Sequence, residues 1–223
     1  MIRANTRSRL TASDLQLALL LLSRGSAHRR ASLERRLAVE GPDALLDSPE
    51  LAERLLAVRT LLVPSEPLFL YVLVRHALRE AAIDDRDLAD YLAAMLLDFG
   101  RRDRAWRVDW NDDQRHRYLV DILMDLEASN GPRRFKVMVH LGNYALWLAG
   151  LFPDYIAARH LRKAGPDLGY YDALGSRGFG LASDHELADE FGLDGVFRSA
   201  AEQFPSVRTA LNGVSERVFF PVH

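Results

Sequence analysis

The chain has no cysteine among its 223 residues. This absence excludes a disulfide framework, a thiolate zinc site, an iron–sulfur cluster and a cysteine nucleophile. It fits a reducing compartment, so we expect a cytoplasmic protein. A signal peptide is the alternative, because three arginines precede the apolar run 17–22. Asp14 and Gln16 interrupt this region, and a signal peptide's apolar stretch normally carries no acid, so an ordinary helix is preferred.

Lysine is almost missing as well: Lys136 and Lys163 are the two lysines, and arginine supplies the other 27 basic residues. Together with abundant alanine and leucine, this bias indicates a GC-rich bacterial genome. The formal net charge is only −2, so no overall field draws the chain toward nucleic acid or an anionic membrane. We therefore expect neither a nucleic-acid nor a membrane partner.

Alternating strand patterns with hairpin turns are absent, and no repeat period recurs along the chain. Apolar residues instead recur at spacings of three and four, which predicts amphipathic helices. The expected fold is all-α, a multi-helix bundle of about ten mostly short helices, at lengths usual for globular proteins. We expect one helical domain over 1–223, with an N-terminal lobe 1–64 packed on 65–223 as the alternative division.

Local signals place several of these helices. Thr11 and Asp14 are spaced like a capping box, and Ser48 precedes Pro49 as an N-cap precedes a first-turn proline. The apolar run 68–74 could form a strand. It continues without a turn signal into helix-forming residues, so a buried helix is the preferred interpretation.

The stretch 133–150 is apolar on nearly every side in its second half, which predicts a buried central helix. Four of its residues fall at i, i+3, i+4 and i+7 and so share one face: His140, Asn143, Tyr144 and Trp147. Buried imidazole and carboxamide groups need hydrogen-bond partners. This stripe is therefore either a satisfied core network or the lining of a ligand pocket.

A second candidate region is the glycine-rich tract 167–189, which we expect to be rich in loops. Its potential ligand-binding residues are Tyr170, Tyr171, Asp172, Arg177 and His185. His185 and Asp189 have a spacing that can place two metal ligands on one helix face, but two ligands do not make a site. No metal site is predicted, and the sequence assigns no cofactor.

Arginine and tryptophan alternate over 101–110, a pattern that could suit a single-stranded nucleic acid through stacking and phosphate contacts. Several aspartates dilute the positive charge of this stretch and its surroundings. A surface linker with its tryptophans folded back onto the body is the preferred interpretation.

Two functional hypotheses follow. The preferred one is a non-catalytic module that binds a protein partner, associates with itself or holds a small ligand, since no complete catalytic constellation can be assembled. The alternative is an all-α hydrolase or nuclease, with or without a metal, that uses His140 or His185 with Asp172 or a neighbouring acid. This alternative requires His140, Asp172 and His185 to meet in one open pocket.

Overall fold

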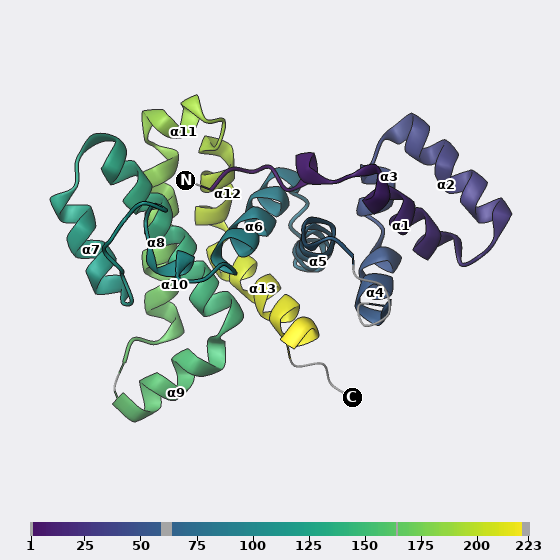
Figure 1. Ribbon diagram of the computed structural model, residues 1–223. Helices are drawn as coiled ribbons and strands as arrows, with labels where there is room; N and C mark the ends of the chain where they lie inside the picture. The colour runs from purple at the N-terminus through teal and green to yellow at the C-terminus, as the bar shows by residue number, and fades with distance from the viewer. Residues whose placement is uncertain (1, 59–63, 164, 220–223) are drawn as a thin grey trace.

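The computed structural model describes residues 2–58, 64–163 and 165–219, leaving the side chains of 163 and 219 aside. This part of the chain contains thirteen α-helices and no strand, which confirms the predicted all-α bundle (Figure 1). Eleven of the helices have seven or more residues, close to the ten expected. No helix in the described ranges is both long and apolar enough to cross a membrane.

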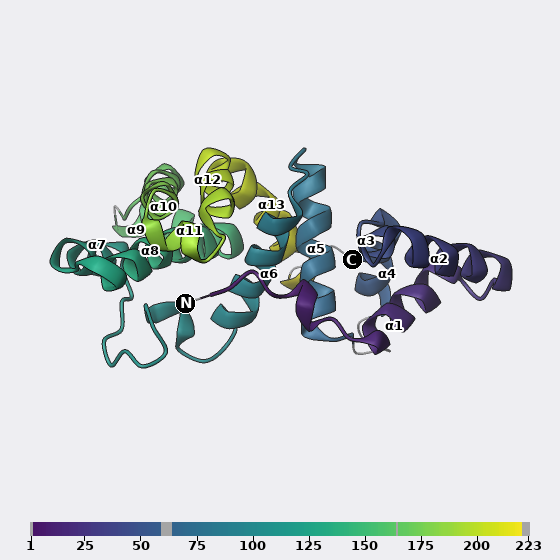
Figure 2. The same cartoon turned by 90° about the horizontal axis from the view of Figure 1, so that it is seen from above.

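The first four helices lie together at one end of the molecule in both views (Figures 1 and 2). They are α1 (Ala12–Ser23), α2 (Ala27–Glu40), α3 (Asp43–Leu46) and α4 (Pro49–Val58), and a short 3-10 turn, η1 (Arg7–Arg9), precedes them. The predicted capping box opens α1, because Thr11 and Asp14 each bond the other's backbone amide. The division into lobes 1–64 and 65–223 stays a prediction.

Three helices form the middle of the molecule: α5 (Glu66–Glu80), α6 (Arg86–Phe99) and α13 (Phe204–Phe219). The apolar run 68–74 lies within α5, so the preference for helix over strand is confirmed. α5 packs on α4 on one side and on α6 and α13 on the other. It therefore links the N-terminal helices to the remainder of the chain.

The other end holds the remaining elements: η2 (Arg104–Trp106), α7 (Leu119–Ala128), α8 (Gly131–Leu151), α9 (Pro153–Lys163), α10 (Leu168–Ser183), α11 (Glu186–Glu190) and α12 (Asp194–Glu202). α8 is the predicted buried helix, and it packs on α7, α9, α10 and α13. A single cluster of buried apolar side chains extends from the N-terminal helices to α13.

The tract 167–189 differs from the expectation. Instead of loops, it forms one continuous helix, α10, followed by a tight turn and α11. The prediction was wrong because it read glycine as a turn residue, whereas these glycines permit close helix contact. A Cβ on Gly178 would lie 2.7 Å from the backbone nitrogen of Gly142 and 3.0 Å from the carbonyl oxygen of Met138.

Two further glycines accommodate aromatic rings. A Cβ on Gly142 would meet the Phe179 ring at 2.7 Å, and one on Gly175 would meet the Phe204 ring at 2.1 Å. The absence of side chains thus brings α8 and α10 to backbone contact and leaves room for the rings between the helices. Helix packing in this end of the molecule depends on these positions.

We expect Gly178→Ala to destabilise the protein by about 2 kcal/mol, because its methyl group meets backbone atoms that only a helix shift can move. Urea denaturation measures this loss. Gly180→Ala on the same helix is the matched control, since its Cβ would find its nearest atom 3.9 Å away. It should gain up to about 1 kcal/mol from helix propensity. Equal effects of the two substitutions would refute the close-contact explanation.

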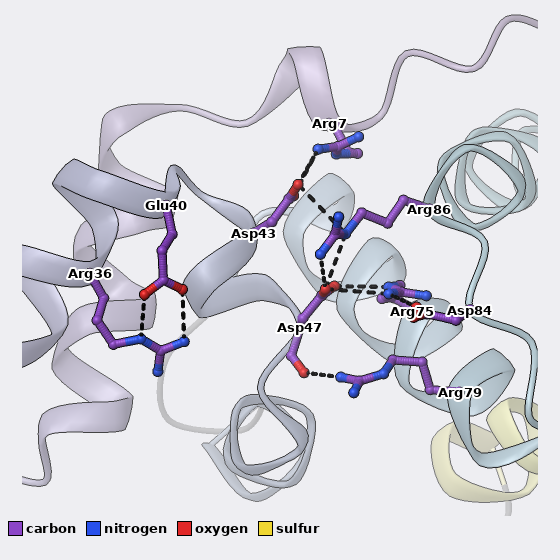
Figure 3. A network of polar contacts seen from close by, with 9 residues as sticks. All are labelled: Arg7, Arg36, Glu40, Asp43, Asp47, Arg75, Arg79, Asp84 and Arg86. Carbon is purple, nitrogen blue, oxygen red and sulfur yellow. Dashed lines mark hydrogen bonds and ion pairs between the residues drawn. The ribbon is translucent and has the colours of Figure 1, made fainter.

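Asp47, which follows α3, joins the N-terminal helices to α5 and α6 through arginine side chains (Figure 3). Arg75 Nε donates to its Oδ1 at 2.8 Å, and Arg86 Nη2 donates to its Oδ2 at 2.6 Å. Arg79 donates to the Asp47 carbonyl oxygen at 2.6 Å. Arg75 is 1% exposed and has Asp84 as its second carboxylate partner. We call these five residues the Asp47 network.

The charge on Asp47 is stabilised within this network. Desolvation raises the pKa of Asp47, but the hydrogen bonds from Arg75 and Arg86 outweigh it and hold the pKa below its ordinary value of 3.8. A carboxylate with a lowered pKa contributes stability above its ordinary pKa and loses that contribution as the pH falls through the folded-state pKa. The network is therefore fully formed at neutral pH and weakens only in acid.

We expect Asp47→Asn to lower the free energy of unfolding at neutral pH by about 3 kcal/mol, because the buried Arg75 guanidinium loses one of its two carboxylates. The difference from the unsubstituted chain should shrink as the pH falls below 3.8, where that chain loses the same charge. Urea denaturation across this pH range measures both effects. Glu40→Gln, which breaks the exposed Arg36 pair, is the control and should change little. A neutral-pH stability equal to the unsubstituted chain's would contradict the role of Asp47.

Candidate functional site

Three of the four residues in the predicted polar and aromatic stripe of α8 are buried, and Trp147 is half-buried. His140 is 3% exposed and Asn143 is 2% exposed. Asn143 is satisfied, because the Tyr91 hydroxyl donates to its Oδ1 at 2.9 Å. These two residues therefore belong to the core.

His140 lies in an aromatic environment, with ring centroids 5.9 Å from Phe99, 6.4 Å from His116 and 6.0 Å from Tyr144. Within the described chain, its Nε2 has no hydrogen-bond partner. Burial, together with the nearby charges of Arg104 and other residues, holds the pKa of His140 well below its ordinary 6.5. The imidazole is therefore neutral at physiological pH.

A buried polar cluster lies beside His140. His116 is fully buried, and its Nε2 is 3.2 Å from Asp125 Oδ2. Asp125 Oδ2 accepts a hydrogen bond from Arg133 at 2.5 Å, and its Oδ1 accepts one from Ser129 at 2.8 Å. Desolvation raises the pKa of Asp125, but these donors outweigh it and hold the pKa below 3.8. The carboxylate is committed to protein donors, and no group of three or more histidine or acidic residues in the described ranges is arranged to hold a metal ion.

Farther along the stripe, Tyr144 is 3% exposed and Trp147 is half-buried. Tyr144 and Trp147 line a cavity of about 460 Å³ at the end of α8. The Tyr144 hydroxyl donates to the carbonyl oxygen of Arg117 at 2.7 Å, which fixes its ring against the loop before α7. Burial raises the pKa of Tyr144, so this hydroxyl keeps its proton and remains a donor.

α10 separates the residues of the second predicted set. Tyr170 and Tyr171, in its first turn, line a cavity of about 270 Å³ together with Tyr144. Asp172 instead accepts a hydrogen bond from Arg208 Nε at 2.7 Å. The two tyrosines thus line the same cavity as Tyr144, whereas Asp172 is engaged with α13.

Arg177 and His185 lie farther along. Arg177 is exposed on α10. His185 is the N-cap of α11, and its ring centroid is 5.0 Å from that of Phe135. Asp172 lies eleven positions before the end of α10 at Ser183, about 16 Å at the helical rise of 1.5 Å per residue, and His185 lies beyond that end. With His140 in the core, the three residues of the enzyme hypothesis do not meet in one open pocket.

Three adjoining cavities, of about 460, 270 and 260 Å³, share Tyr118 and Arg159. They lie where the end of α8, α9, the start of α10 and the residues before α7 come together. We call this surface the aromatic groove. Its rings are Trp106, Tyr118, Tyr144, Trp147, Phe152, Tyr155, Tyr170 and Tyr171, and its arginines are Arg117, Arg159 and Arg162.

The guanidinium groups of the groove lie on its rings. The Cζ atom of Arg159 is 4.9 Å from the centroid of Tyr118, and that of Arg117 is 5.1 Å from the centroid of Trp106. Among the described residues that line the groove there is no carboxylate and no imidazole. The groove therefore combines an apolar floor with uncompensated positive charge.

Exposed apolar side chains gather at the same end of the molecule. Of the eleven large hydrophobic residues that are most exposed in the described chain, seven lie between residues 118 and 170. They are Tyr118, Val120, Met124, Phe152, Tyr155, Leu161 and Tyr170. Such concentrations mark interaction surfaces more often than chance.

The predicted binding residues include four of the eleven rings and arginines of this groove and miss the other seven. Phe152, Tyr155 and Arg159 come from the end of α8 and from α9, and Trp106 and Arg117 come from the loop before α7. One sequence signal for α9 was available: Tyr155 and Arg159 stand at i and i+4, so an arginine and an aromatic ring share a helix face. Trp106, which had been interpreted as part of a surface linker, lies half-buried in η2, and its neighbours Arg104 and Ala105 are buried.

Another large cavity, of about 470 Å³, lies beside the Asp47 network and is lined by Arg36, Glu40, Asp43, Asp47, Arg79 and Arg86, among others (Figure 3). Its carboxylates already have arginine partners: Asp43 pairs with Arg7 at 2.7 Å, and Glu40 pairs with Arg36 at 3.2 Å. Because these charges neutralise one another, we favour the aromatic groove as the binding site.

Comparison with known proteins adds no assignment, since no family model, no curated protein and no solved structure matches the chain.

The buried His140 should make stability depend on pH. The unfolded chain protonates this residue below about pH 6.5 while the folded chain does not, so folding free energy is lost as the pH falls from 6.5. His140→Leu should remove up to about 1.4 kcal/mol per pH unit of that loss. Denaturant titrations between about pH 7 and 5 measure the slope. Identical slopes for the two chains would show that His140 is not held neutral.

Proposed function

We propose that this protein is a non-catalytic interaction module and that the aromatic groove is the surface through which it binds a protein partner. The observation that carries the proposal is the meeting of eight aromatic rings and three arginines around one continuous depression. Tyrosine, tryptophan and arginine dominate the binding energy of protein interfaces.

The exposure of the rings favours a protein over a small molecule. Tyr118, Phe152, Tyr155 and Tyr170 are 40–54% exposed, so the groove is shallow. Small-ligand sites instead enclose most of the ligand surface. A protein segment can cover the groove together with the neighbouring Val120 and Met124 side chains.

The groups in the groove are suited to binding rather than to proton transfer. The described lining offers guanidinium groups and phenols, and Tyr144 already donates its proton to a backbone carbonyl. The hydrolase or nuclease alternative depends on His140, Asp172 and His185, which lie apart. We therefore propose no reaction. The cytoplasm is retained as the proposed location, on the absence of cysteine.

Charge specifies the kind of partner. Arg117, Arg159 and Arg162 have no ion-pair partner among the described residues. A partner segment that combines carboxylates with an aromatic or large aliphatic side chain would satisfy both the guanidinium groups and the rings.

Selection from a library of displayed short peptides on the immobilised full chain tests this proposal. We expect the selected peptides to be enriched in acidic and aromatic residues. Tyr155→Ser and Arg159→Glu should each weaken binding of a selected peptide by about tenfold or more, as removal of an interface anchor does. Fluorescence anisotropy with a labelled peptide measures the change in Kd.

Leu20→Ser is the matched control, because Leu20 is 50% exposed on α1, at the other end of the molecule. It should leave peptide affinity unchanged. Peptides whose binding ignores both groove variants, or a selection that yields none, would overturn the proposal.

A further inference from the structure

The groove's positive, aromatic surface has a complement elsewhere on the same chain. Four acidic residues lie on and beside α11: Asp184, Glu186, Asp189 and Glu190. All four are exposed, and they adjoin Phe191, a large aromatic residue that is 42% exposed. We call these five residues the acidic corner.

The carboxylates of the acidic corner are uncompensated. Asp43, Asp47 and Asp84, which lie at the ends of other helices or next to them, have arginine partners. Within the described chain, none of the four carboxylates of the corner lies in an ion pair or accepts a hydrogen bond from a side chain. The groove thus carries unpaired positive charge and the corner carries unpaired negative charge. Each of the two surfaces also has exposed aromatic side chains.

The two surfaces lie at opposite ends of α10. Tyr170 and Tyr171 begin that helix at the groove, and Asp184 follows its end at the corner. Sixteen helical residues span about 24 Å. Figure 1 shows the same separation, with α11 at the upper end and α9 at the lower end of this part of the molecule. A chain therefore cannot place its corner in its own groove.

We infer that the groove receives the acidic corner of a second copy of this chain, with Phe191 on the aromatic floor and the carboxylates against Arg117, Arg159 and Arg162. The inference rests on the proposed function and names its partner. Because one surface binds a different surface, the contact is head-to-tail, and successive copies form a chain or a closed ring. The low net charge of −2 offers little overall repulsion to such assembly.

Sedimentation analysis across a concentration series tests this inference. The unsubstituted chain should sediment as a species heavier than the 25.2 kDa monomer. High salt should lower the mass of that species because salt screens the ion pairs. Arg159→Glu impairs the groove, and Phe191→Ser impairs the corner. Each variant alone should sediment as a monomer.

An equimolar mixture of the two variants gives the sharpest outcome. The intact corner of Arg159→Glu fits the intact groove of Phe191→Ser, and the two remaining surfaces are both impaired. The mixture should therefore form a species of twice the monomer mass and nothing larger. If the melting temperature shows that losing the Phe191 contact with Phe135 disturbs the fold, a corner variant with Asp189→Asn and Glu190→Gln takes the place of Phe191→Ser, because neutral amides cannot pair with the groove of Arg159→Glu.

Other outcomes separate this inference from the proposed function. A chain that stays monomeric at every concentration while its groove binds the displayed peptides would overturn the self-association and leave the interaction module standing. An oligomer that survives both variants would overturn the head-to-tail contact. If groove substitutions change neither peptide binding nor mass, both proposals fail.

Discussion

The contact between α8 and α10 is the constraint on which this end of the molecule depends. Gly142 and Gly178 let the two backbones approach so closely that a single methyl group on Gly178 would meet backbone atoms. The rings of Phe179 and Phe197 stack in the space beside this contact, with centroids 5.8 Å apart, and Tyr91 meets Phe197 edge-on at 5.4 Å. Each atom–atom dispersion contact in such a tightly packed region is weak, but the sum over many contacts is large.

This close contact also positions the groove. Because α8 and α10 are in contact near their middles, Tyr144 on one helix and Tyr171 on the other line the same cavity. The hydrogen bond from Tyr144 to the Arg117 carbonyl then fixes the loop that supplies Trp106 and Arg117. A floor held by packed helices loses little conformational freedom when a partner binds, which favours affinity.

Much of the fold could be predicted from the sequence, because its signals are local. The capping box at Thr11 and Asp14 opens α1, and the apolar stretch 133–150 lies within the buried α8. The tract 167–189 was wrongly interpreted as loops. The sequence alone does not distinguish a glycine that permits close helix contact from a glycine that makes a turn. Only the partner across the contact distinguishes them, and that partner is more than thirty residues away in the chain.

The candidate site was less predictable for a related reason. The i, i+3, i+4 and i+7 spacing correctly placed His140, Asn143, Tyr144 and Trp147 on one helix, but it could not say where along that face the core ends and the surface begins. This boundary is set by what other elements cover. The loop before α7 buries His140 beneath His116, whereas Trp147 lies beyond that cover and lines the groove.

The Asp47 network shows what arginine provides in this protein that lysine would not. Arg75 and Arg86 each present two nitrogens to the Asp47 carboxylate, and a planar guanidinium can meet two oxygens at once. A lysine ammonium is a compact point charge on a flexible stem and offers no such fork. The chain has 27 arginines. Replacing Arg75 or Arg86 with lysine would keep the positive charge but lose the contact of two nitrogens with the Asp47 carboxylate.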